Sequence, residues 1–192
     1  GSASRAQPNL QGEDGGRQIQ ALDLVSGAVR LGPGGIGAGA HTDALAAAFA
    51  RREPFRHLVI DDFLDAGFAA RLLEQFPAFE RGNARNEAGE LGGKSTIERI
   101  RALGDAYTEL DDLIRTRAFL DFVGAITGIA DLRYDPHYFG GGTHENRDGQ
   151  DLDPHIDFNR HPLEPWHRRL NLIVYLNREW EDAWGGSLEL HS

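Results

Sequence analysis

The clearest β-strand pattern in the chain is Leu170-Asn171-Leu172-Ile173-Val174-Tyr175-Leu176. Every residue of this stretch except Asn171 is apolar or aromatic, which is typical of a strand in the core of a β-sandwich or barrel. Further along the chain, Gly185-Gly186 predicts a turn into an alternating strand at 187–191. Upstream, residues 132–139 predict another strand, interrupted by a proline. This half of the sequence therefore predicts a β-rich core.

The residues before this region predict helices. Apolar residues at helical spacing indicate helices over residues 43–50, from Asp65 to Pro77, and over 108–117 and 118–127. A buried strand is expected at 55–60, and the polar, glycine-rich residues 80–95 predict a long mobile loop. Helices followed by strands favour an α+β fold that contains a β-sandwich over a parallel βαβ sheet.

Length and composition narrow the functional classes. The 192 residues suit one domain, which we place at 41–192, after a glycine-rich and charged arm at 1–40 that could add a strand to a sheet edge around 19–25. The chain has 30 Asp+Glu against 20 Lys+Arg, and its net charge of −10 argues against nucleic-acid binding. No stretch has the run of about 18 apolar residues that a membrane span needs. Because cysteine is absent, a metal would need histidine and carboxylate ligands.

The triplet His155-Ile156-Asp157 is the most informative chemical motif. In an extended segment, His155 and Asp157 lie two residues apart and point to the same face. One imidazole nitrogen and one carboxylate oxygen on that face can converge on a single metal ion. Two histidines and one carboxylate bind non-haem Fe(II) and leave positions open for O₂ and a co-substrate. Because such triplets are also common on protein surfaces, the spacing alone makes these two residues candidate metal ligands.

The ordered motifs between Tyr134 and Leu190 resemble the prolyl 4-hydroxylase-like branch of the Fe(II)/2-oxoglutarate-dependent dioxygenases. The motifs that carry the resemblance are Tyr138-Phe139-Gly140-Gly141-Gly142, His155-Ile156-Asp157, Arg168–Asn177, Trp180 and Gly185-Gly186-Ser187-Leu188. The stretch 55–64 is also similar to the opening strand-to-helix step of such proteins. The resemblance covers roughly residues 54–192, and its specificity comes from the order of the motifs.

The resemblance implies a double-stranded β-helix, also called a jelly roll, with N-terminal helices that buttress one sheet. It implies Fe(II) held by His155 and Asp157, with 2-oxoglutarate as co-substrate and O₂ as oxidant. Tyr138 and Tyr175 fall where the family has tyrosines near the far carboxylate of 2-oxoglutarate, and Asn171 lies on the same strand face as Tyr175. Tyr134 competes with Tyr138 for that role, and Tyr175 also fits a core tyrosine.

The implied activity is hydroxylation of an unactivated C–H bond. A prolyl residue in a protein or peptide is the favoured substrate, although small molecules are also substrates in related enzymes. The third iron ligand and the basic anchor for 2-oxoglutarate are expected beyond Ser192, so the jelly roll is expected to be incomplete at the C-terminal end of this sequence. Dependence on Fe(II) and a metabolic acid suggests the cytoplasm.

Two other functions fit the same sequence. The first is a non-catalytic jelly-roll binding module that lacks a complete iron triad. The second is a cupin-like metalloenzyme that does not use 2-oxoglutarate. Outside the motif, the segment from His161 to Trp166 could form a lid or substrate rim, Arg168 is expected to be a surface or supporting charge, and the Asp111-Asp112 pair is interpreted as a solvated helix face.

Overall fold

The computed structural model describes residues 17–18, 24–26, 29–37, 42–51, 53–85, 91–150 and 154–191. Within these ranges the α-helices are α1 (Thr42–Ala50), α2 (Ala66–Glu74), α3 (Asp105–Ile114) and α4 (Arg117–Thr127). The short 3₁₀ helices are η2 (Phe79–Arg81), η3 (Ile100–Ala102) and η4 (Asp182–Trp184). The strands are β1 (Arg17–Gln18), β2 (Leu24–Ser26), β3 (Leu31–Gly32), β4 (Gly35–Ile36), β5 (Val59–Asp61), β6 (Asn83–Arg85), β7 (Leu91–Ile97), β8 (Thr143–Glu145) and β9 (Glu189–Leu190). The mixture of helices and small, mostly antiparallel sheets agrees with an α+β fold.

The helices form where capping residues and apolar spacing predict them. The Asp65 carboxylate accepts hydrogen bonds from the backbone N–H groups of Gly67 and Phe68, at 3.0 and 3.1 Å, and so caps α2. Thr116 caps α4 in the same way through its bond from Phe119 N. Gly128 ends α4 in the left-handed conformation, with a φ of 69°. The sequence interpretation of these helices is confirmed.

Replacing Asp65 tests the α2 cap. We expect Asp65→Ala to lower the free energy of unfolding by about 1 kcal/mol, because two N–H groups at the helix start lose their acceptor. Asp65→Ser, which keeps a capping oxygen, is expected to retain most of the stability. Urea unfolding of both variants measures the difference, and equal losses in the two would show that the cap contributes nothing.

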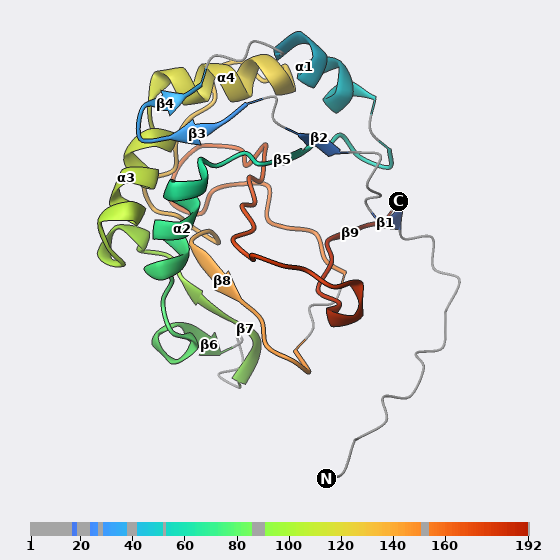
Figure 1. The fold of residues 1–192 in the computed structure, drawn as a ribbon. Helices are drawn as coiled ribbons and strands as arrows, with labels where there is room; N and C mark the ends of the chain where they lie inside the picture. The colour runs from blue at the N-terminus through green and yellow to red at the C-terminus, as the bar shows by residue number, and fades with distance from the viewer. Residues whose placement is uncertain are drawn as a thin grey trace.

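Two apolar clusters hold the helices together. The first packs α1 against α4 and includes Val29, Leu45, Phe49 and Ile126. The second joins α2, η3 and α3 around Phe68, Leu72, Ile100 and Tyr107. Figure 1 shows α1 and α4 across the top of the view and α2 and α3 at its left, and Leu176 of the later chain packs against the second cluster. The helices therefore provide the rigid support for the later loops.

Part of the predicted N-terminal arm is packed on this core. Val29 and Leu31 are 3% and 1% exposed, and β3 pairs with β4 in a tight hairpin. In addition, β2 runs parallel to β5, with Leu24 opposite Val59. Apolar side chains scattered among glycines are thus sufficient to anchor these residues, which the sequence alone placed in an irregular arm.

The region predicted as a mobile loop at 80–95 contains paired strands, so that prediction is wrong for its described residues. β6 pairs antiparallel with β7, and β7 pairs antiparallel with β8, with Thr96 opposite His144. The glycines and polar residues of β7 gave no periodic signal. Its pairing with a strand about fifty residues later is a long-range contact that local sequence does not encode.

Two predicted strands are not strands in the described structure. Residues 132–135 have no regular structure, residues 136–137 form a turn, and Tyr138 has a φ of 52°, which takes the chain out of extended geometry. Residues 170–176 have no strand partner among the described residues, and Leu172, Ile173 and Tyr175 remain more than half exposed, at 53, 53 and 56%. A segment of high strand propensity forms a strand only where its backbone is hydrogen-bonded to a neighbouring strand.

Candidate functional site

The glycine loop at 140–142 directs the chain from the helical side toward the predicted metal site. Gly142 has a φ of 100°, and a side chain there would collide with the backbone carbonyl of Ile97. Only glycine fits both the conformation and the close approach. The close packing against the end of β7 fixes the start of β8, after which the chain passes to residues 154–158.

His155 and Asp157 lie on one side of a non-helical segment, as the sequence predicts. His155 Nε2 is 3.5 Å from Asp157 Oδ1, and the side chains are 50 and 42% exposed. Ile156, between them, is 98% exposed and points away from the protein interior. The arrangement puts one nitrogen and one oxygen next to each other at an accessible position; their role as metal ligands stays a prediction.

The other oxygen of Asp157 is held by two side chains. Asn171 Nδ2 donates to Asp157 Oδ2 at 2.8 Å, and Arg168 Nη2 lies 3.3 Å from the same oxygen. Desolvation raises the pKa of Asp157, but the Asn171 hydrogen bond and the positive charges of Arg168, His155 and Lys94 outweigh it, so the pKa lies below its usual value. Asp157 is therefore an anion around neutral pH.

The donor atoms fit a small divalent ion. Nitrogen and oxygen ligands lie about 2.0–2.2 Å from such a metal, so two ligand atoms on one ion are at most about 4.3 Å apart. The observed 3.5 Å between His155 Nε2 and Asp157 Oδ1 is within that limit. In the described ranges no group of three His, Asp or Glu side chains is arranged to hold a metal ion. The pair could thus supply two of the ligands.

The tyrosines lie in different environments. Tyr138 donates its hydroxyl proton to Asp111 Oδ1 at 2.7 Å, and Tyr134 donates to the same oxygen. Because a phenol has one proton to donate, Tyr138 in this arrangement cannot also donate to a co-substrate carboxylate. Tyr175 is 56% exposed, with its ring 6.1 Å from that of Trp180. Contact of Tyr138, Tyr175 and Asn171 with 2-oxoglutarate stays a prediction.

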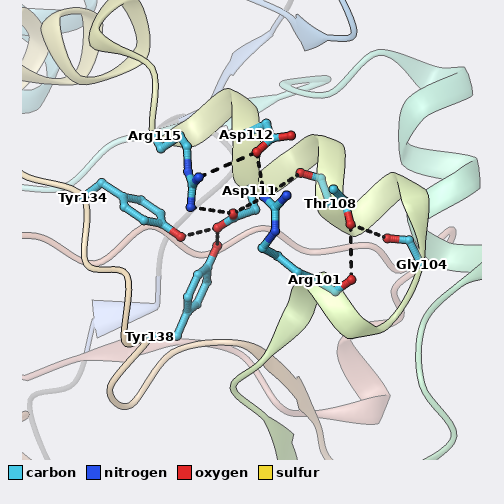
Figure 2. Close-up of polar contacts among 8 residues, drawn as sticks. All are labelled: Arg101, Gly104, Thr108, Asp111, Asp112, Arg115, Tyr134 and Tyr138. Atoms are coloured by element: carbon cyan, nitrogen blue, oxygen red, sulfur yellow. Dashed lines mark hydrogen bonds and ion pairs between the residues drawn. The ribbon is translucent and has the colours of Figure 1, made fainter.

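Asp111 is not part of a solvated helix face, so that interpretation is wrong for this residue. Its side chain is 0% exposed and receives Arg101 Nη1 at 2.6 Å and Arg115 Nη2 at 3.1 Å, besides the two phenols (Figure 2). Asp112, one residue on, points outward with its side chain 55% exposed. The i,i+4 spacing of Asp111 and Arg115 was visible in the sequence, but their burial under the tyrosines was not.

This cluster, which we call the Asp111 network (Arg101, Asp111, Arg115, Tyr134 and Tyr138), joins η3 and α3 to the loop before the glycines. Burial raises the pKa of Asp111, but hydrogen bonds from Tyr134, Arg101 and Tyr138 and the charge of Arg115 outweigh it and leave the pKa below its usual value. Desolvation and the hydrogen bond to Asp111 both raise the pKa of Tyr138. The network therefore keeps a carboxylate charged inside the protein.

The segment from His161 to Trp166 folds back on itself beside the site. His161 N donates to Trp166 O at 2.9 Å, and the His161 ring nitrogen Nδ1 accepts from the N–H groups of Leu163 and Glu164. The His161 side chain is only 6% exposed and stacks near Phe139 and Trp166. The role of the segment from His161 to Trp166 as a rim or lid stays a prediction.

Comparison with known protein families finds a match over part of the chain. Residues 141–192 match the 2OG-Fe(II) oxygenase superfamily. Residues 141–192, which we call the oxygenase-like segment, contain His155, Asp157, Arg168 and Asn171. The match supports the resemblance at the level of the superfamily. No curated protein and no solved structure gives a significant match to the chain. Separately, none of the described helices has the length and apolar character needed to cross a membrane.

Proposed function

We propose that the protein is an Fe(II)- and 2-oxoglutarate-dependent oxygenase that hydroxylates an unactivated C–H bond. The proposal is supported by the oxygenase-like segment together with one geometric observation, the 3.5 Å approach of His155 Nε2 to Asp157 Oδ1. His155 and Asp157 would hold Fe(II), which would supply the activation of O₂ in a reaction that converts 2-oxoglutarate to succinate and CO₂ and transfers one oxygen atom to the substrate.

The protein's own residues have three tasks in this reaction. His155 and Asp157 hold the metal through one nitrogen and one oxygen, and Asp157 stays ionised because Asn171 and Arg168 stabilise its charge. Lys94 and Arg168 add positive charge around Asp157, which favours an anionic co-substrate nearby. Tyr175 and Asn171 are the side chains that we assign to contact with that co-substrate.

The substrate class that we propose is a prolyl residue of a protein or peptide, as in the branch that the motifs resemble. We assign contact with such a chain to the turn from His161 to Trp166, which is closed by the hydrogen bond from His161 N to Trp166 O. We further propose that the segments 154–158 and 170–176 belong to a jelly roll, and that the protein acts in the cytoplasm, where Fe(II) and 2-oxoglutarate are supplied by metabolism. Nucleic acid and membrane are not proposed partners.

Turnover of the keto acid tests the proposal without knowledge of the substrate. We expect the full-length protein, given Fe(II), ascorbate and 2-oxoglutarate, to release succinate slowly alone and faster with proline-containing peptides. Succinate is measured by mass spectrometry, with omission of Fe(II) or of O₂ as controls. Oxygen uptake that is independent of the keto acid, or no succinate at all under these conditions, would contradict the proposal.

A further inference from the structure

Two hydrogen bonds and one ion pair join three side chains of the oxygenase-like segment in a closed cycle. Arg168 Nε donates to Asn171 Oδ1 at 2.9 Å, Asn171 Nδ2 donates to Asp157 Oδ2 at 2.8 Å, and Arg168 Nη2 lies 3.3 Å from the same Asp157 oxygen. The amide of Asn171 is thereby fixed, because its oxygen accepts from a group that can only donate. Each member holds the other two in place.

Arg168 is itself fixed by aromatic packing. Its guanidinium carbon lies 4.6 Å from the centre of the Phe158 ring, and Phe158 packs edge-to-face on Phe139 at 5.2 Å. Gly140 lines the same place: a Cβ atom there would be 3.1 Å from Phe158 and 3.8 Å from Arg168. The Arg168 side chain is 24% exposed. The cycle is thus backed by the glycine loop and two aromatic rings.

The two carboxylate oxygens of Asp157 have different partners. Oδ2 is occupied by Asn171 and Arg168, whereas Oδ1 faces His155 Nε2 at 3.5 Å. A carboxylate without such partners rotates about its last bond and can offer either oxygen, or both, to an ion. Holding Oδ2 removes this freedom and leaves one oxygen directed at the imidazole.

We infer that Arg168 and Asn171 are positioning residues that present a single oxygen of Asp157, beside His155, to the metal ion. The inference rests on the proposed function, because it assumes that His155 and Asp157 bind a metal. It also assigns Asn171 a role toward Asp157 in addition to its expected contact with the co-substrate. Partners of this kind typically contribute 10–100-fold to metal affinity.

Cobalt(II) can test the positioning role of Asn171 separately from its contact with the co-substrate, since the absorption spectrum of the bound ion reports the geometry of its ligands. We expect Asn171→Ala and Arg168→Ala each to weaken Co(II) binding about 10–100-fold in the full-length protein and to change the visible spectrum of the bound ion. Asn171→Ser, whose side chain is too short to bridge, should behave like Asn171→Ala. The exposed neighbours Arg169→Ala and Asn177→Ala are matched controls and should leave affinity and spectrum unchanged.

A double-variant cycle adds a second criterion. Because Arg168 and Asn171 are hydrogen-bonded to each other, the loss of affinity in the double variant should be smaller than the product of the two single losses. If the folded Asn171 and Arg168 variants bind Co(II) with the affinity and spectrum of the wild type, this inference is wrong, but the proposed function is not affected. If the wild type binds no Co(II), or if His155→Ala binds it unchanged, the proposed function fails as well. Circular dichroism confirms that each variant is folded.

Discussion

Asp111→Ala is expected to lower the free energy of unfolding by about 2–4 kcal/mol. The substitution removes the acceptor of two phenols and two guanidinium groups, and hydrogen bonds to a charged group contribute about 1.5–3 kcal/mol each before compensation. The arginines can recover part of this loss because they are partly exposed, with side chains 46 and 44% accessible. The hydroxyl groups of Tyr134 and Tyr138 are half-buried and have less access to water, so they recover less of this loss.

Asp112→Ala is the matched control for this prediction. Asp112 is adjacent and also pairs with Arg101, but its side chain is 55% exposed. Exposed ion pairs contribute about 0–1 kcal/mol, so we expect a change of that size. Urea unfolding followed by tyrosine and tryptophan fluorescence measures both variants. Equal losses at the two positions would contradict the distinction between the buried and the exposed carboxylate.

The Asp111 network also predicts a dependence on pH. Because the pKa of Asp111 is lowered in the folded protein, its contribution is present above the pKa of an unfolded aspartate, about 3.9, and is lost as the pH falls through the lower folded value. The stability difference between the wild type and Asp111→Asn should therefore narrow below about pH 4. A difference that stays constant down to pH 2 would show that the charge of Asp111 contributes nothing.

His155→Ala is expected to reduce metal affinity more than about 100-fold and succinate release to background. Partners of metal ligands contribute 10–100-fold, and a ligand itself contributes more. His155 is half-exposed at a position without regular structure, so the substitution should change the unfolding temperature little. Calorimetric titration with Fe(II) under argon measures the affinity, and the succinate assay measures turnover.

The exposed His167, which pairs with Arg160 in an isolated β-bridge, provides the control for His155. His167→Ala removes an imidazole of the same kind from the same segment of the chain, and we expect its metal affinity to equal that of the wild type. If both variants lose metal binding equally, the loss does not come from a specific ligand. If neither loses it, His155 is not a ligand and the proposed site is wrong.

Local signals predicted the helices, and non-local pairing explains what the sequence did not predict. Asp65 and Gly128 act within one turn of their own helices, so their effect can be recognised from neighbouring residues. By contrast, β7 gains its strand geometry from β6 and β8, and Leu170–Leu176 has the propensity of a strand without a partner in the described part of the chain. Pairing of this kind requires knowledge of the fold.

In the candidate site, too, local features were predicted from the sequence and non-local ones were not. His155 and Asp157 are two residues apart, so their shared direction followed from the period of an extended chain. Asp111 escaped recognition because its burial depends on Tyr134 and Tyr138, which come more than twenty residues later and reach it through a turn. The hydrogen bond from the Tyr138 hydroxyl to Asp111 was likewise not predicted, and contact of Tyr138 with the co-substrate stays a prediction. A buried network of this type becomes visible only in three dimensions.

The pairing of β1 with β9 has a consequence for synthesis of the protein. Arg17 lies opposite Leu190, so this contact joins residues from near the beginning and near the end of the sequence (Figure 1). On the ribosome, β1 must wait without its partner until the residues up to Leu190 have been translated. The helices, whose contacts are local, can assemble in the meantime. Docking of β1 on β9 is thus expected to follow the assembly of the helices.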